Sequence, residues 1–304
     1  MAEFHENLIS PGEAVTLDGL FACRVKRSGK RPAYRFFDKA TKAWSTLTWE
    51  EMAGAVARWQ VGLSGEAVPR GGRVALQLRN CPEWVMFDQA ALSLGLVTVP
   101  LYTDDRPDNI AYILSEADVQ VLLVQDASRW RRLAAVVGDE GPLKRILLLD
   151  DSAAARELAR EDERVLCVSD WLPAGQASLL MRQDADPHAL SSIVYTSGTT
   201  GRPKGVMLSH HNMLSVAHGG LTLLDCYEED VFLSFLPLSH TLERTGGYYL
   251  PIMTGSCVAY ARSVAQLGED LTTIQPTALI AVPRIFERVY GRISDQMAKK
   301  GGLA

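Results

Sequence analysis

The stretch from residue 191 to residue 208, SSIVYTSGTTGRPKGVML, holds the residues best suited to chemistry. An apolar, β-branched strand is expected to end at Thr196, and a short loop rich in hydroxyls and glycines follows. The loop residues are Thr196, Ser197, Gly198, Thr199, Thr200 and Gly201, with Lys204 just beyond. Glycines let backbone approach a ligand closely, and consecutive N–H groups can form an anion-binding nest. Because Lys204 adds a mobile positive charge, the pattern predicts a phosphate loop rather than a ligand-free connector.

The spacing excludes several better-known loops. A Walker A loop needs four residues between its first glycine and Gly-Lys, with Ser or Thr after the lysine, whereas Gly205 follows Lys204 here. The stretch is not a GxGxxG fingerprint or a GxSxG nucleophile elbow either. A metal site at His210, His211 and His218 is not favoured, because adjacent residues point to different faces of a regular element.

Three segments resemble one family. YTSGTTGRPKGV is similar to the phosphate-binding signature of the adenylate-forming superfamily, which includes acyl-CoA synthetases, luciferases and the adenylation domains of peptide synthetases. FLPLSHTLER, residues 235–244, resembles the next motif of that family, and its His-x-x-Glu-Arg form is most similar to long-chain fatty acyl-CoA synthetases. AVPRIFERVY, residues 281–290, resembles the segment that gates the fatty-acyl tunnel in those enzymes.

The resemblance implies a two-step ligase that uses ATP, Mg²⁺ and CoA and activates a fatty acid through an acyl-adenylate. It places the loop residues and Lys204 on the phosphates, with the Thr196 hydroxyl as a Mg²⁺ ligand. It places His240 at the border of the acyl and adenylate site, as the candidate catalytic residue. Phe286 falls at the aromatic gate. From its spacing alone, Phe286 is also compatible with a core position on a helix over 284–296.

The chain lacks other segments of that family. We find no Tyr-Gly-x-Thr-Glu segment for the adenylate, no Thr-Gly-Asp segment for the ribose, and no hinge or small C-terminal domain with its lysine. We therefore expect an N-terminal large-domain portion that forms no acyl-CoA alone, with adenine, ribose and CoA contacts lying beyond residue 304. Two alternatives stay open: a ligase for aryl or shorter acids, and a non-catalytic nucleotide- or acyl-binding module.

The elements around these motifs predict an α/β fold with mostly parallel sheets covered by helices, because strands and helices alternate. Strands are expected at 73–78, 97–101, 119–125 and 145–150, and helices at 82–94, 107–117, 127–137 and 152–161. A hairpin over 33–38 and 45–48 precedes a helix from Trp49, with Thr48 and Glu51 as a capping box. Further strands are expected at 191–196, 231–236, 256–261 and 277–282. A soft boundary near 184–187 divides a first α/β subdomain, 1–185, from the start of a second, 186–304.

Composition and charge narrow the functional classes. The 304 residues carry a formal net charge of −5, which disfavours a dedicated nucleic-acid binder. The N-terminus has no apolar signal region and no apolar run could span a bilayer, so we expect a cytoplasmic protein. The five scattered cysteines fit reduced, packed thiols. A basic stretch from Arg24 to Arg35 leaves contact with the inner face of a membrane open, although a solvated helix end is favoured. Apolar surface exposed by a missing portion leaves a homodimer open.

Overall fold

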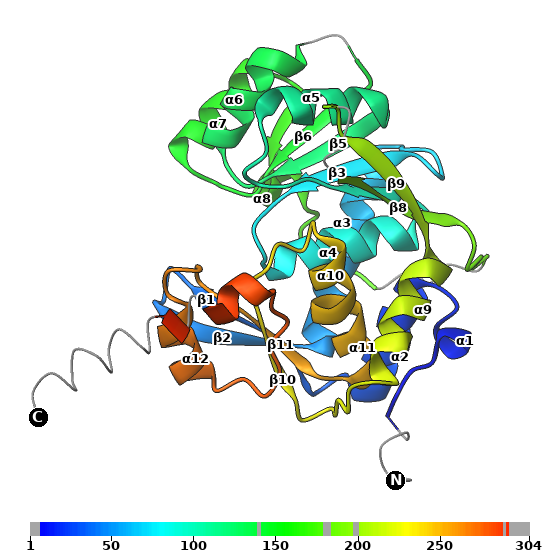
Figure 1. The fold of residues 1–304 in the computed structure, drawn as a ribbon. Coiled ribbons are helices and arrows are strands. Elements are labelled where there is room, and N and C mark those ends of the chain that lie inside the picture. The colour runs from blue at the N-terminus through cyan, green and yellow to red at the C-terminus, as the bar shows by residue number, and fades with distance from the viewer. Residues whose placement is uncertain (1–6, 139–140, 179–183, 197–200, 288–289, 292–304) are drawn as a thin grey trace, which may run out of the picture.

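The computed structural model describes residues 7–138, 141–178, 184–196, 201–287 and 290–291. Within them the strands form a seven-stranded and a four-stranded sheet, and a layer of helices lies between the two (Figure 1). The α/β fold with mostly parallel sheets is confirmed.

The larger sheet is parallel except for its last pair. In spatial order its strands are β7 (Val165–Cys167), β6 (Arg145–Leu148), β5 (Val119–Val124), β3 (Arg73–Gln77), β4 (Val97–Pro100), β8 (Leu190–Thr196) and β9 (Lys204–Ser209). Only β8 and β9 pair antiparallel. The strands β3, β4 and β5 are almost completely buried, as expected for a parallel sheet covered on both faces.

Helices cover the larger sheet on both faces. The outer face carries α5 (Pro107–Glu116), α6 (Ala127–Val137) and α7 (Ala153–Glu161), which share one apolar core with the sheet. The inner face carries α3 (Trp49–Gly65) and α4 (Pro82–Ser93), whose core continues to the second sheet. Because α4 and α5 lie on opposite faces, the chain reverses its winding direction at β3 and β4. In open α/β sheets, ligands bind at the carboxyl ends of strands at such a reversal.

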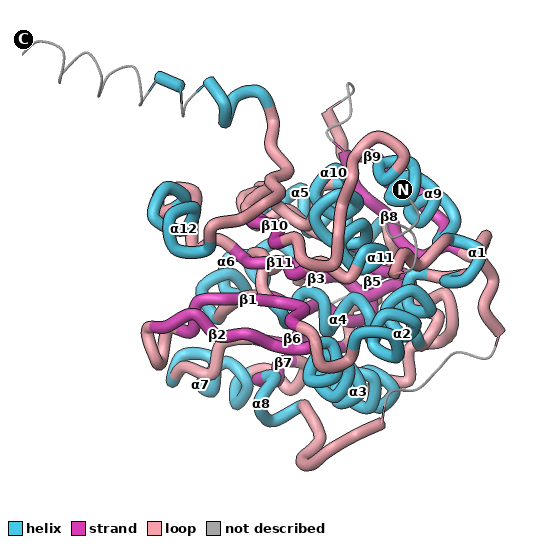
Figure 2. The backbone as a smooth tube through the Cα atoms, turned by 90° about the horizontal axis from the view of Figure 1, so that it is seen from below, coloured by secondary structure: helices cyan, strands magenta, loops and turns pink. Residues whose placement is uncertain are grey.

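The smaller sheet joins distant parts of the chain (Figure 2). Its order is β10 (Val231–Ser234), β11 (Cys257–Tyr260), β1 (Pro32–Asp38) and β2 (Ala43–Thr48). β1 and β2 form the expected hairpin, and β1 pairs parallel with β11 through Tyr34↔Val258. The predicted capping box of Thr48 and Glu51 at the start of α3 is confirmed.

Helices from both ends of the described chain complete the layer between the sheets. They are α1 (Pro11–Ala14), α2 (Leu17–Ser28), α9 (His210–Leu221), α10 (Thr241–Arg244), a π-helix (Thr245–Tyr249) and α11 (Leu250–Thr254). Two further helices, α8 (Val168–Trp171) and α12 (Leu267–Ile274), lie outside this layer.

Two strand predictions were wrong or incomplete. The strand expected at 277–282 is only an isolated bridge from Ala278 to Phe232, and Pro283 then starts a helical turn. The strand β9 was missed, because its first residues were interpreted as part of the loop.

Each sheet takes strands from both sides of residue 185. β8 and β9 complete the larger sheet, while β1 and β2 complete the smaller one. The division into subdomains 1–185 and 186–304 therefore does not follow the sheets, and as a division into folding units it stays a prediction.

Within the basic stretch, Arg24 is buried, whereas Lys26, Arg27 and Lys30 are exposed. Arg24 is fully buried and donates to the backbone oxygens of Ile252 (2.8 Å) and Met253 (2.7 Å) at the end of α11. Arg27 pairs with Glu13, and Arg31 pairs with Glu228. Because Arg24 is buried, the prediction of a solvated helix end and the prediction of a surface patch are both wrong for this residue. No helix in the described ranges has the length and apolarity that crossing a membrane requires.

Candidate phosphate and acyl site

The site predicted from sequence lies at the carboxyl edge of the larger sheet. β3, β4 and β8 run parallel, so their carboxyl ends meet at one edge, and Thr196 is the last residue of β8. β9 returns antiparallel with Lys204 directly opposite Thr196. Both side chains are exposed at the loop end of this hairpin. Residues Ser197, Gly198, Thr199 and Thr200 lie outside the described residues.

The loop end of the hairpin is held by close packing and charge. A Cβ added to Gly205 would lie 2.8 Å from Cγ2 of Ile193, so glycine is needed for the two strands to approach. Gly201 has a φ of +92°, which favours glycine. Behind the strand, the Tyr195 hydroxyl hydrogen-bonds Glu116, and the Arg202 guanidinium lies 5.3 Å from the centre of the Tyr112 ring. Lys204 is therefore presented from a fixed strand rather than a free loop.

His240 is exposed and caps a helix. Its Nδ1 accepts a hydrogen bond from the Leu242 N–H at 3.2 Å, at the start of α10. With Nδ1 used as an acceptor, a neutral ring carries its proton on Nε2 and can donate it to a ligand. His210, in contrast, is buried and its Nδ1 accepts from the Leu17 N–H, while His211 is exposed, so the two do point to different faces.

The helix that follows His240 is attached to the strand that carries Thr196. Arg244, the last residue of α10, donates to Oγ of Ser192 on β8 at 2.5 Å and to Oγ1 of Thr98 on β4 at 2.9 Å. Ser192 precedes Thr196 by four residues on β8, about 13 Å along the strand. The structure thereby links the His240 segment and the β8–β9 hairpin through one buried guanidinium.

Arg244 belongs to a buried polar network that spans three helical elements. Its guanidinium pairs with Asp88 on α4 at 2.6 Å, and both side chains are 0% exposed. The hydroxyls of Tyr248 (3.1 Å) and Tyr249 (3.0 Å) donate to the other Asp88 oxygen. Burial acts to lower the pKa of Arg244, but the Asp88 carboxylate and the tyrosines outweigh it and the net shift is upward.

A second carboxyl is buried beside this network. Glu243 is 1% exposed, and burial raises its pKa to about 7 against the opposing effect of the Ser234 hydroxyl. A Cβ at Gly247 would lie 2.5 Å from Oε1 of Glu243, so the π-helix passes over this carboxyl only with glycine there.

Phe286 is distant from the β8–β9 hairpin in sequence, and it lies on the protein surface. It belongs to a helical turn at 283–287, and its side chain is 60% exposed, so it is not a core residue. The preceding segment packs against the π-helix, because a Cβ at Gly246 would lie 3.2 Å from Cδ1 of Ile280. Most of the helix predicted over 284–296 lies outside the described residues.

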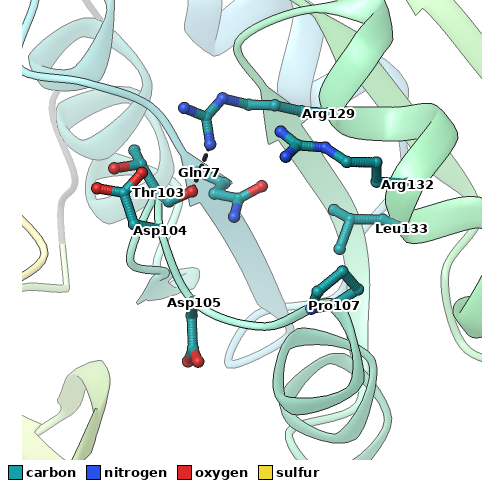
Figure 3. A pocket seen from close by; sticks show the side chains of 8 residues that line it. All are labelled: Gln77, Thr103, Asp104, Asp105, Pro107, Arg129, Arg132 and Leu133. Atoms are coloured by element: carbon teal, nitrogen blue, oxygen red, sulfur yellow. Dashed lines mark hydrogen bonds between the residues drawn. The ribbon is translucent and has the colours of Figure 1, made fainter.

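A polar hollow of about 220 Å³ opens on the outer side of the same sheet edge (Figure 3). Gln77 at the end of β3 forms its floor, Asp104 and Asp105 form one wall, and Arg129 and Arg132 of α6 form the other. Arg129 donates to the Thr103 oxygen at 2.5 Å, which ties α6 to the loop after β4. Among the described residues, none of the sequence-predicted site residues lines this hollow.

A Mg²⁺ ion and its nucleotide fit the donors at the hairpin. Mg²⁺ prefers oxygen ligands, retains several waters and is held together with substrate phosphates, so the exposed Thr196 hydroxyl is a suitable ligand. The Lys204 ammonium has no lone pair for a metal and can pair only with the phosphates. Within the described ranges, no cluster of three or more His, Cys, Asp or Glu residues could hold a metal ion.

Sequence reasoning missed the residues that hold the site together. No local pattern distinguishes Asp88 from other helix residues in the sequence. Arg244 is predicted only as part of the His-x-x-Glu-Arg motif. The polar residue Asn80, three residues after the end of the buried strand β3, was also missed. A charged residue within an otherwise apolar helix such as α4 is the signal that could have identified Asp88, because isolated buried charge requires a partner.

Comparisons with known proteins agree with the resemblance. A model of the family described as AMP-binding enzyme matches residues 21–303. The chain is 28% identical to a probable CoA ligase, CCL6, of Humulus lupulus, over 100% of this chain and 46% of that protein. It is 30% identical to the peroxisomal long chain acyl-CoA synthetase 6 of Arabidopsis thaliana, over 84% of this chain and 37% of that protein. The chain thus spans less than half the length of these curated relatives.

Solved structures share the fold. The crystal structure of the anthranilate CoA ligase AuaEII in complex with anthranoyl-AMP superposes with a TM-score of 0.79 at 20% identity. The match covers 94% of this chain and 52% of that one. At this identity the likeness establishes the architecture alone.

Proposed function

Because the chain belongs to the AMP-binding enzyme family, we propose that it carries the phosphate-binding and acyl-binding part of an ATP-dependent long-chain fatty acid–CoA ligase. The relatives named long chain acyl-CoA synthetases, at about 30% identity, support the choice of a long-chain acid. The His-x-x-Glu-Arg form of residues 240–244 supports the same choice.

The observation that carries the proposal is the register of Thr196 and Lys204 at the loop end of the β8–β9 hairpin. In the proposed reaction, a carboxylate oxygen attacks the α-phosphorus of ATP, and pyrophosphate leaves to give an acyl-adenylate. The CoA thiol then forms the thioester and releases AMP. The first step brings a carboxylate towards a polyanion, so it needs positive charge and donors that stabilise the leaving pyrophosphate.

The residues divide this work. Lys204 and the loop Ser197–Gly201 bind the phosphates, and the Thr196 hydroxyl is a ligand of Mg²⁺, which when bound neutralises phosphate charge. His240, with a donor at Nε2, borders the acyl carboxyl and the adenylate. Phe286, exposed at the end of the segment beside the π-helix, gates the acyl chain.

The test measures carboxylate-dependent exchange of pyrophosphate into ATP by the full-length protein that contains this chain. Palmitate, octanoate and benzoate are compared, and acyl-CoA formation is followed in parallel. We expect palmitate to give the highest kcat/KM. A preference for benzoate would replace the proposal with an aryl-acid ligase, and nucleotide binding without exchange for any acid would indicate a non-catalytic binding module. We propose that the 304-residue chain alone forms no acyl-CoA. Its acyl-CoA formation should not exceed that of the Lys204→Ala variant of the same chain, which serves as the background control.

A further inference from the structure

Asn80 connects the larger sheet to the segment that carries His240. It follows β3 by three residues, at the carboxyl edge of the sheet. Its Nδ2 donates to Oγ of Ser234 at 2.9 Å and to the Leu236 oxygen at 2.7 Å. Its Oδ1 accepts from the Leu238 N–H at 3.0 Å. One amide side chain thus makes three hydrogen bonds to a five-residue stretch of another sheet.

After Ser234, this stretch no longer belongs to the smaller sheet. β10 ends at Ser234, and the isolated bridge on its free side involves Phe232, earlier in the strand. Asn80 takes over the backbone groups of Leu236 and Leu238 that a neighbouring strand would otherwise satisfy. The His240 N–H then donates to the Pro237 oxygen at 2.9 Å, so the turn that presents the imidazole is built on the residues that Asn80 holds.

The position of Asn80 along the sheet also corresponds to that of the loop end of the β8–β9 hairpin. Leu76 pairs with Pro100, and Thr98 pairs with Ser192, so the ends of β3 and β8 are level along the strands. They are separated only by β4, which corresponds to about 10 Å across the sheet. A residue fixed to the end of β3 therefore holds the His240 turn at a set distance from Thr196.

We propose that Asn80 is a positioning residue for adenylation: it fixes the 234–238 stretch so that His240 faces the acyl carboxyl at the phosphate hairpin. The inference rests on the proposed function for its kinetic part. The amide is chemically required, because both donors and the acceptor are used. Aspartate keeps the acceptor for Leu238 but places a carboxylate against the Ser234 hydroxyl and the Leu236 oxygen, with no N–H to donate.

The kinetic test is a double-variant cycle on acid-dependent pyrophosphate exchange in the full-length protein. Asn80→Ala is expected to lower kcat by roughly a hundredfold, the cost of a displaced reacting group, with little change in the KM for ATP. If Asn80 acts through His240, the Asn80→Ala/His240→Ala double variant is no slower than His240→Ala alone. Losses that multiply would overturn the proposal. Asn109→Ala, which removes a surface amide bonded to Asp105, is the matched control and should retain wild-type exchange.

A second arm does not depend on activity. Hydrogen–deuterium exchange of peptides covering 235–241 is expected to be at least tenfold faster in Asn80→Ala, while peptides from β5 and α6 are unchanged. Asn80→Asp should show the same local loss. Unchanged exchange at 235–241 would overturn the positioning role even in an active enzyme. If the wild-type protein shows no acid-dependent pyrophosphate exchange, the proposed function fails, and this arm still decides whether Asn80 holds the segment.

Discussion

The Arg244 guanidinium lies 2.6 Å from the Asp88 carboxylate, with both side chains completely buried and 156 positions apart in sequence. Arg244 ends the helix that His240 begins, and Asp88 lies in the middle of α4. Trp84 and Tyr249 flank the cation, with ring centres 5.3 Å and 5.7 Å from the guanidinium carbon. The pair therefore ties the motif segment to the layer between the sheets.

Asp88→Ala should destabilise the fold strongly. It leaves an unpaired buried guanidinium and two tyrosine hydroxyls without their acceptor, and such a loss typically costs about 3–5 kcal/mol. Urea unfolding followed by tryptophan fluorescence measures the change. Arg156→Ala, which breaks a surface pair with Asp151 at side chains about half exposed, is the control and should cost about 1 kcal/mol or less. Equal effects of the two variants would contradict a special role for the buried pair.

The buried carboxyl of Glu243 predicts a pH-dependent stability. Its pKa is raised from 4.5 to about 7 in the folded protein, so the folded state holds a proton that the unfolded chain releases above pH 4.5. Stability is therefore lost as pH rises from about 4.5 to 7, by about 3 kcal/mol for this group.

Glu243→Gln should remove that loss. The free energy of unfolding is measured in urea at pH values from 5 to 8, and the variant should gain on the wild type as pH rises. Glu269→Gln, at a side chain that is 71% exposed, should follow the wild-type slope. Parallel curves for Glu243→Gln and wild type would show that this carboxyl does not titrate in the range.

Lys204→Ala should slow pyrophosphate exchange in the full-length protein by roughly 10²–10³-fold, the typical cost of losing one group that stabilises developing charge. The fold should be unaffected, because the side chain is exposed at the end of the hairpin. Lys144→Ala, which removes an amine bonded to Gln120 at the far end of the sheet, provides the comparison. Exchange at the wild-type rate in Lys204→Ala would exclude this lysine from the site.

Phe286→Ala should alter which acids are accepted while leaving stability nearly unchanged, because the ring is 60% exposed. Each buried CH₂ of an acyl chain contributes about 0.8 kcal/mol, so a changed tunnel entrance should shift kcat/KM more for palmitate than for octanoate. Leu223→Ala, at a side chain that is 85% exposed on the loop after α9, tests for a general surface effect. The same ratio of rates for the two acids in all three proteins would rule out a gate at Phe286.

The outer strand β9 predicts self-association of the isolated 304-residue chain. It is the last strand of the larger sheet within the described residues, and the neighbouring side chains Val206 and Met207, which point to opposite faces, are 44% and 67% exposed. Unpaired apolar edge strands favour pairing with another chain. Sedimentation velocity should show a concentration-dependent dimer that Met207→Lys weakens. A monomer at all concentrations would contradict this prediction.

The sequence predicted local elements well because their signals are local. The runs at 73–78 and 119–125 are buried strands, and the Thr48–Glu51 capping box starts α3 as expected. The pairing of β1 with β11 had no local signal, because it joins Tyr34 to Val258 across the whole domain. The strand expected at 277–282 failed because an apolar run shows propensity but not whether a partner strand is available.

The candidate site was only partly predictable for the same reason. The Gly- and Thr-rich pattern pointed to Thr196 and Lys204, which the structure places opposite each other, and their phosphate-binding role stays a prediction. Asn80 and Asp88 act on residues more than 150 positions away, so neither spacing nor periodicity indicated their partners. The roles of His240 and Phe286 stay predictions.

The parallel pairing of β1 with β11 also has a consequence for biosynthesis. The strands β3 to β7 need only residues up to about 168 to pair with one another, so this part of the larger sheet can form early as the chain leaves the ribosome. The β1–β2 hairpin has been made by then, but its parallel partner is about 90 residues later, and Arg24 likewise waits for the carbonyls of α11. Translation takes roughly 5–20 residues per second, so the nascent chain spends several seconds or more with a bare strand edge and an unsatisfied arginine. Slowly translated codons for residues 168–258 would lengthen that interval. During it, the unpaired edge of β1 is exposed and available to a chaperone that binds nascent chains.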